Sequence, residues 1–142
     1  MSKTIIVVDG MGGGIGAQLV ARIRKDIGTD VVLVAIATNA VATQRMVDAG
    51  AVRGASGENA FRISLPEADF IVGPLGIVLP NAMMGEVTAA MAEAVLSSRA
   101  KKILLPLAQS HISLVGLAPR HNVGELVEEA VATLIKALDG KE

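Results

Sequence analysis

The chain has 142 residues, which suits one domain, and it contains no cysteine, so disulfides, thiolate metal ligands and cysteine nucleophiles are excluded. The 13 lysines and arginines nearly balance the 14 acidic residues, so no overall positive field attracts nucleic acid or an anionic membrane surface. Hydrophobic residues make up 51% of the chain and charged residues only 19%, so we expect part of the apolar surface to close against another copy in a homo-oligomer.

Two features of the sequence are typical of a cytoplasmic protein without a membrane span. The apolar segment 70–84 is short, and glycine and proline interrupt it. Near the N-terminus, Asp9 and the glycines after it interrupt the stretch in which a secretory signal needs continuous apolar residues.

The most informative segment is the glycine-rich stretch 9–17 (DGMGGGIGA). It follows the β-branched run 4–8 and precedes apolar residues at helical spacing, so it is predicted to join a buried strand to a helix over about 15–27. The first amides of a helix lack partners within the helix, and glycine lets a ligand approach the backbone. The alternative is a turn whose glycines only let strand and helix pack closely. We expect an anion site formed by Asp9, Gly10, Gly12, Gly13, Gly14, Ile15 and Gly16.

The spacing of these glycines fits two nucleotide-binding patterns. Gly12, Gly14 and Ala17 fit GxGxxG/A, whereas Gly10, Gly14 and Gly16 fit GxxxGIG. The P-loop pattern does not fit, because the chain has no lysine at the required position. Both fitting patterns place a glycine where a phosphate would approach the backbone.

A second buried strand is predicted over 31–37, followed by a helix over 40–49 that Thr38 or Asn39 caps and Gly50 ends. A dinucleotide site usually has an acidic residue about 20 positions beyond its glycine loop, where it binds the ribose. Neutral Thr38 and Asn39 occupy this place and can still hydrogen-bond a sugar. These two residues do not indicate whether NAD or NADP would bind, so the ligand can be NAD(P) or another nucleotide.

The next stretch allows two interpretations. Residues 51–53 are predicted as a short strand and 56–65 as a helix, although 61–65 alone would also suit a strand. With the helix, Glu58 and Asn59 would lie near the same edge of the sheet and face the site. Glu58 has the alternative role of a first-turn acid that stabilises the helix dipole.

A further buried strand is predicted over 68–72, and a tight loop follows it. Gly73, Pro74 and Gly76 would form this loop, and their backbone would make the opposite wall of the site. The apolar residues 77–79 would then be either a lid over the pocket or a dimer contact.

The next helix is predicted to begin between Ala82 and Val87, and strands are predicted over 102–107 and, at the edge of the sheet, over 112–117. Methionines at helical spacing in this helix are typical of core packing rather than of a binding site. Its expected buried residues are Met84, Val87, Met91 and Val95, with Ala92 and Leu96 beside them.

The last helix has the clearest pattern in the chain. Asn122 and Glu125 predict its start, and the face it buries is apolar throughout. His111 and His121 lie in predicted turns with no third ligand nearby, so we expect no metal site. The apolar face consists of Val123, Leu126, Val127, Ala130, Val131, Leu134, Ile135 and Leu138.

Strands that alternate with helices predict a single α/β domain over residues 1–142, with a three-layer, doubly wound, mostly parallel sheet of Rossmann-like type. Ligands bind such sheets beyond the carboxyl ends of the strands. The loops at 9–10, 38–39 and 73–74 all follow predicted strands, so we expect them to meet at one rim.

Five motifs, DGMGGGIG, ATNAVAT, GASGENA, IVGPLGIV and MMGEVTAAMAEA, together resemble a family of short bacterial Rossmann-like proteins that carries only a domain-of-unknown-function label. The resemblance runs from Lys3 to about Glu129 and implies a nucleotide-binding-like fold without an assigned substrate or reaction. The glycine loop alone, Gly10 to Gly16, is similar to the cofactor loop of short-chain dehydrogenases. Their catalytic tyrosine has no counterpart, since the chain contains no Tyr.

Three functional hypotheses remain open. In the first, the protein binds a nucleotide, a dinucleotide or another phosphorylated small molecule at the glycine loop, and Asp9 either meets a cation or proton there or ties down the loop amides. In the second, an enzyme uses Asp9, Glu58 or Glu86 as acid or base, with help from Asn59 or Asn81. In the third, the chain is a homo-oligomeric scaffold with a vestigial site.

Overall fold

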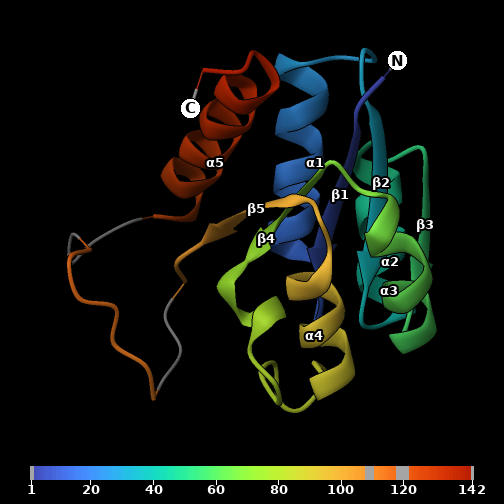
Figure 1. Cartoon of the computed structure of the whole chain (residues 1–142), viewed down its shortest axis with the longest axis vertical. Coiled ribbons are helices and arrows are strands. Elements are labelled where there is room, and N and C mark those ends of the chain that lie inside the picture. The colour runs from blue at the N-terminus through green and yellow to red at the C-terminus, as the bar shows by residue number, and fades with distance from the viewer. Residues whose placement is uncertain (1, 108–110, 118–121, 142) are drawn as a thin grey trace.

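A five-stranded parallel sheet forms the centre of the molecule in the computed structural model, which describes residues 2–107, 111–117 and 122–141 (Figure 1). The strand order is β3-β2-β1-β4-β5, and every pairing between neighbours is parallel. Chain order reverses between β1 and β4, which makes the carboxyl ends of these strands the topological switch point. The strands are β1 (Thr4–Asp9), β2 (Val32–Ala37), β3 (Arg53–Ser56), β4 (Phe70–Pro74) and β5 (Lys101–Leu105).

Helices cover both faces of this sheet. On one face, Leu19 of α1, Met46 of α2 and Leu134 of α5 belong to one buried cluster, and α5 lies beside α1 (Figure 1). On the other face, Phe61 of α3 and Val95 of α4 belong to a second cluster. The predicted Rossmann-like three-layer fold is therefore confirmed. The helices are α1 (Gly14–Asp26), α2 (Ala40–Ala49), α3 (Glu58–Ser64), α4 (Ala89–Ser97) and α5 (Val123–Leu138), with 3-10 turns η1 (Leu65–Glu67) and η2 (Leu75–Val78).

The capping residues act as the sequence predicts. Asn39 caps α2 by accepting a hydrogen bond from the Ala42 amide at 2.8 Å, and Asn122 caps α5 by accepting one from the Glu125 amide at 2.8 Å. Among the described residues, no helix combines the length and the apolar content that crossing a membrane requires.

The ambiguous stretch 61–65 is helical, and Phe61 is completely buried on its inner side. The third strand, however, covers Arg53–Ser56 rather than 51–53, and Gly57 rather than Ser56 precedes the helix. The strand is displaced because it pairs with the carboxyl half of β2, with Ser56 opposite Ala37. This pairing places the carboxyl end of β3 on the same side of the sheet as the glycine loop.

The predicted start of α4 is wrong, because Thr88 caps this helix at Ala89 and residues 81–87 form a loop. Asn81, Met83 and Met84 have left-handed backbone conformations, which a helix does not allow. The side chain of Met84 is consequently 93% exposed instead of buried, and Leu96 is 57% exposed on the outer side of α4. The other predicted core residues of this region are buried: Val87, Met91, Ala92 and Val95.

Two further predictions concern apolar segments. Ile77 is fully buried in the cluster beneath α3 and α4, whereas Val78 and Leu79 are partly buried, so Ile77 belongs to the core and the role of residues 77–79 as a lid or a dimer contact stays a prediction. The prediction of an edge strand over 112–117 is wrong: Ile112 takes part only in an isolated bridge, turns and bends follow, and Val115 is fully exposed. An apolar run becomes a strand only if it forms a ladder of hydrogen bonds with a neighbouring strand, and no such ladder extends along this segment. His121 lies outside the described residues.

Substitution of Phe61 tests the inner face of α3. Phe61→Ala is expected to lower the free energy of unfolding by about 3–5 kcal/mol, because it leaves a cavity beneath the helix. Ile63→Ala, on the outer side of the same helix, is the matched control and should change it by less than about 0.5 kcal/mol. Urea denaturation measures both, and similar losses in the two variants would contradict this packing.

Candidate functional site

Asp9, the last residue of β1, holds the glycine loop against the start of α1. Its carboxylate is 4% exposed, and its two oxygens accept hydrogen bonds from the amides of Gly10 at 2.8 Å and Gly16 at 2.7 Å. The Gly16 amide belongs to the first turn of α1, where it has no partner within the helix. Of the two roles considered for Asp9, the structure therefore supports the one in which it ties down the loop amides.

Burial raises the pKa of Asp9, and the negative charge of Glu86 adds to this effect, whereas the two amide hydrogen bonds and Arg45 oppose it. A raised pKa means that the folded chain holds this proton at a pH at which the unfolded chain has released it. The contribution of Asp9 to stability is therefore complete below the ordinary value of 3.8 and declines as the pH rises through the raised pKa.

The glycines of the loop divide into two groups. A side chain at Gly13, whose φ is 73°, would meet the Ala42 backbone at 2.7 Å, and one at Gly16 would meet the Asp9 Cβ at 2.9 Å. A Cβ at Gly12 or Gly14 would meet nothing closer than 3.5 Å, and only the guanidinium of Arg45. Packing within the chain thus requires glycine in the first group but leaves the second open toward the outside.

Some backbone amides of the loop have an acceptor within the protein, and others do not. The Gly13 amide donates to the Gly10 carbonyl at 2.9 Å, and the Met11 amide donates to Glu86 Oε1 at 2.8 Å. Within the described part of the chain, the amides of Gly12, Gly14 and Ile15 find no acceptor. The protein's own carboxylates therefore accept hydrogen bonds from some amides of the expected anion cradle. Among the described residues, the amides of Gly12, Gly14 and Ile15 stay available to a ligand.

Glu86 reaches this edge of the sheet from the loop before α4. Its Oε1 atom accepts hydrogen bonds from the Met11 amide at 2.8 Å, the Thr38 hydroxyl at 2.5 Å and the Asn39 side-chain amide at 2.9 Å. These bonds lower the pKa of Glu86, so it is ionised at neutral pH. A lowered pKa means that its contribution to stability is present above the ordinary value of 4.5 and is lost as the pH falls through the lowered value.

Arg45 is the residue of this site that the sequence pattern does not reveal. It projects from α2, and its Nη1 atom lies 3.3 Å from the Gly12 carbonyl oxygen, to which it donates. It is the one basic residue within α2, which is a weak signal, because helices commonly carry exposed arginines. Its position beside the open glycines places a positive charge next to the unpaired amides.

Other residues expected at the site lie elsewhere. Glu58 accepts a hydrogen bond from the Thr88 hydroxyl at 2.8 Å, which joins α3 to the start of α4, whereas Asn59 accepts one from Arg62 at 2.8 Å within α3 itself. Gly73 and Pro74 belong to strand β4 rather than to a loop after it, and both are buried.

Packing within the sheet explains the glycine in β4. A side chain at Gly73 would collide with the carbonyl oxygen of Val8 in the neighbouring strand β1. Gly76 is also buried, within η2. The binding roles of Glu58, Asn59, Gly73, Pro74 and Gly76 stay predictions.

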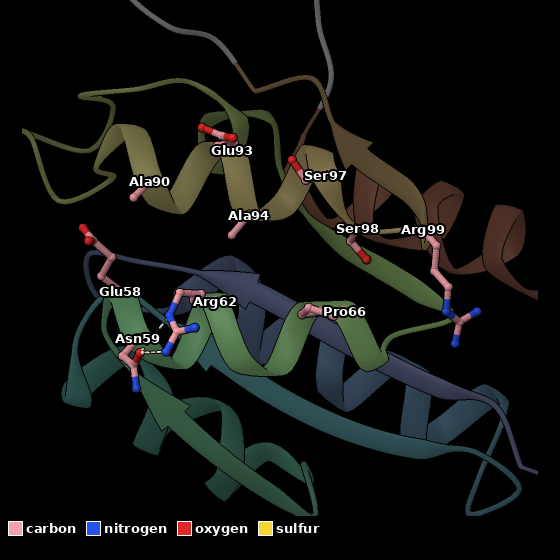
Figure 2. Close-up of a pocket in the computed structure, with 10 residues that line it drawn as sticks. All are labelled: Glu58, Asn59, Arg62, Pro66, Ala90, Glu93, Ala94, Ser97, Ser98 and Arg99. Carbon is pink, nitrogen blue, oxygen red and sulfur yellow. Dashed lines mark hydrogen bonds between the residues drawn. The ribbon is translucent and has the colours of Figure 1, made fainter.

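A groove of about 780 Å³ runs between α3 and α4, away from the glycine loop. Figure 2 shows Ala90 and Ala94 of α4 facing Arg62 and Pro66 of the α3 side across it. At its far end lies Arg99, where the chain passes from α4 to β5.

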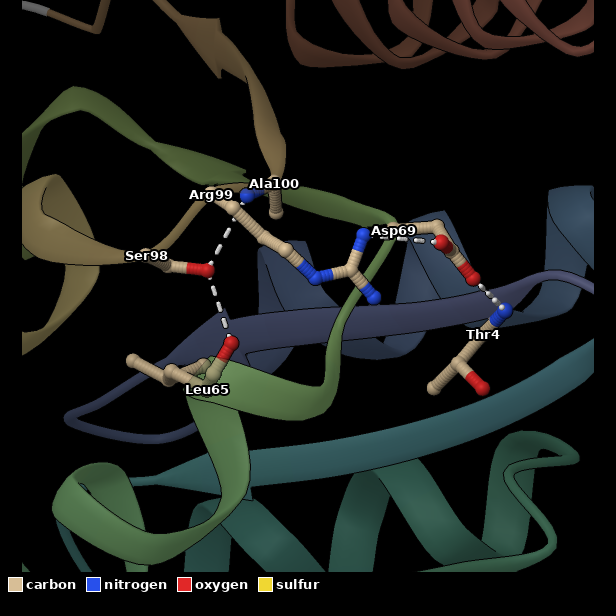
Figure 3. Close-up of polar contacts among 6 residues, drawn as sticks. All are labelled: Thr4, Leu65, Asp69, Ser98, Arg99 and Ala100. Atoms are coloured by element: carbon tan, nitrogen blue, oxygen red, sulfur yellow. Dashed lines mark hydrogen bonds and ion pairs between the residues drawn. The ribbon is translucent and has the colours of Figure 1, made fainter.

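The polar contacts at that end of the groove are structural (Figure 3). The Ser98 hydroxyl donates to the Leu65 carbonyl at 2.7 Å, and Asp69 accepts from the Thr4 amide at 2.8 Å and from Arg99 at 3.4 Å. Together they join the starts of β1, β4 and β5. Across the described ranges, no group of three or more His, Cys, Asp or Glu residues is arranged to hold a metal.

The two groups of glycines should respond differently to alanine. Gly13→Ala is expected to destabilise the fold by at least about 1–2 kcal/mol, because a left-handed conformation and a backbone collision oppose the added methyl group. Gly12→Ala should change the free energy of unfolding by less than about 0.5 kcal/mol. Thermal and urea denaturation compare the two, and equal losses would show that the loop is packed differently.

Asp9→Asn tests the link between β1 and α1. An asparagine amide group would face one of the two backbone amides, so a buried donor loses its acceptor and the free energy of unfolding should fall by about 1–3 kcal/mol. The control is Asp26→Asn, which removes an exposed pair with Arg22 and should cost less than about 1 kcal/mol. A harmless Asp9→Asn would mean that the carboxylate does not hold the loop.

Comparison with protein families matches residues 4–139 to a family described as a domain of unknown function (DUF3842). Comparisons with curated proteins and with solved structures gave no match. The matched region includes all five strands and the complete glycine loop. The chain, matched over nearly its whole length, therefore belongs to the DUF3842 family.

Proposed function

We propose that this protein binds a phosphorylated small molecule, such as a nucleotide, at the carboxyl edge of β1. The phosphate would accept hydrogen bonds from the amides of Gly12, Gly14 and Ile15 and would face the guanidinium of Arg45. The observation that carries the proposal is the open space at Gly12 and Gly14. Packing does not require glycine there, whereas a ligand that approaches the backbone does.

Electrostatics supports an anion at the same place. The start of α1 carries the positive end of a 13-residue helix dipole, and Arg45 adds a full positive charge beside it. Asp9 opposes this field only partly, because both of its oxygens already accept amide hydrogens behind the loop. Arginine and free amides are the donors that proteins commonly use for phosphate.

The acid–base hypothesis has less support from the contacts. The charge of Glu86 contributes to the raised pKa of Asp9, but each Asp9 oxygen already accepts a backbone hydrogen bond, so neither oxygen is presented to a substrate. Glu58 is held by Thr88 beside another groove. No residue is therefore assigned a catalytic role, and self-association through exposed apolar side chains stays a prediction.

Gly14→Asp tests the phosphate site. It should abolish the thermal stabilisation by nucleotides and sugar phosphates while the protein stays folded, because a carboxylate would occupy the cradle where the chain offers open space. In the natural protein, a ligand at 100 times its Kd should stabilise the fold by about 2.7 kcal/mol. Gln18→Glu, one turn further along α1 and exposed, is the charge-matched control and should keep the response.

The panel contains NAD, NADP, FAD, ATP, GTP and sugar phosphates, and any small molecule released on denaturation is identified by mass spectrometry. No response of the natural protein to any of these, with nothing released, would favour the scaffold hypothesis. Unchanged ligand binding by Gly14→Asp would remove the loop from the site.

A further inference from the structure

Three hydrogen-bond donors converge on one oxygen atom at the edge of the sheet. The Met11 amide, the Thr38 hydroxyl and the Asn39 side-chain amide all donate to Oε1 of Glu86. Glu86 is separated from them by 75, 48 and 47 positions, so the arrangement exists only in the folded chain. Convergent donors from a backbone turn and two strand-end residues are the usual construction of an anion cradle. This cradle is complete, and the chain's own carboxylate fills it.

The loop that carries Glu86 closes on itself and bears backbone strain. The Asn81 amide donates to the Val87 carbonyl at 2.7 Å, and the Val87 amide donates to the Ala82 carbonyl at 3.2 Å. Between these closures, Met83 and Met84 have left-handed conformations with φ of 58°, which non-glycine residues rarely adopt. Strain of this kind is relieved if the loop rearranges.

The same loop covers the glycine segment. The sulfur of Met83 lies 2.7 Å from the position that a Cβ on Gly10 would take, whereas Met84 points away from the protein and is 93% exposed. Fully buried Val87 anchors the loop on the side of α4. Rotation of the Glu86 side chain together with rearrangement of residues 81–85 would therefore uncover the cradle and leave the core in place.

We propose that Glu86 is a built-in competitor for an anionic ligand and that the ligand carries two linked phosphates, as a nucleoside diphosphate does. This inference rests on the proposed function. One phosphate would lie at the start of α1 beside Arg45, and an oxygen of the second would replace Oε1 of Glu86 on the Met11, Thr38 and Asn39 donors.

Displacement follows from charge. Glu86 is ionised at neutral pH, and its negative charge raises the pKa of the buried Asp9, which Arg45 lowers. A second phosphate beside the Glu86 carboxylate would meet strong repulsion, whereas a phosphate in its place adds its own charge while one negative charge leaves the site. The carboxylate then gains full hydration as it moves into solvent.

The test compares inorganic pyrophosphate with inorganic orthophosphate by calorimetry. Glu86→Ala should bind pyrophosphate at least tenfold more tightly than the natural protein, and its affinity for orthophosphate should rise much less, because orthophosphate needs only the α1 donors. Glu93→Gln removes a negative charge from α4 and serves as the control, with both affinities unchanged. Arg45→Gln should weaken the binding of both anions.

The outcomes separate the two proposals. If neither anion binds to the natural protein or to Glu86→Ala, the proposed function fails. If both anions bind but Glu86→Ala leaves pyrophosphate affinity unchanged, lowers it, or raises both affinities equally, the phosphate site stands and the competitor role is overturned.

A second measurement does not depend on the folding of the Glu86 variant. In the natural protein labelled with ¹³C at the methionine methyl groups, saturating pyrophosphate should shift the NMR signal of Met83, assigned through Met83→Leu. Orthophosphate should leave that signal in place. A Met83 signal that stays fixed while pyrophosphate binds would overturn the displacement of the loop.

Discussion

The hydrogen bonds between the Asp9 carboxylate and the amides of Gly10 and Gly16 are the contacts on which the rest of the site depends. They join the end of β1 to the first turn of α1, and of the glycines between them Gly12 and Gly14 are open to the outside while Gly13 is packed against α2. A buried carboxylate needs such partners, because an unpaired charge in the interior is very costly. Asp9 takes the amides of Gly10 and Gly16, and no described residue accepts from the amides of Gly12, Gly14 and Ile15.

The glycine loop serves packing and access at different positions. Gly13 and Gly16 let α1 approach α2 and the end of β1, as the structural interpretation of the motif requires. Gly12 and Gly14 meet no such restriction, and they lie beside Arg45. The same short motif therefore contains glycines of both kinds, and the choice between the two interpretations has to be made residue by residue.

Charge at the edge of the sheet comes from parts of the chain that are far apart. Neutral Thr38 and Asn39 follow β2, where dinucleotide-binding proteins usually have an acid. A carboxylate is nevertheless present, because Glu86 reaches the same two side chains from the loop before α4. Arg45 supplies a positive charge from α2, where it donates to the Gly12 carbonyl and lowers the pKa of Asp9. The edge thus has both an attractive and a competing group for an anion.

The layers of this fold follow from local sequence patterns, since continuous apolar runs predict the central strands β1, β2 and β4 and the 3.6-residue period predicts α1 and α5. Such patterns also predict the local caps Asn39 and Asn122, whose contacts span three residues. The start of α4, the burial of Ile77 and the convergence of Met11, Thr38 and Glu86 are set instead by long-range contacts in the folded chain. Local sequence patterns indicate hydrogen bonds between nearby residues and the spacing of buried side chains. The start of α4, the burial of Ile77 and the contacts of Glu86 depend on residues dozens of positions apart, which no local pattern encodes.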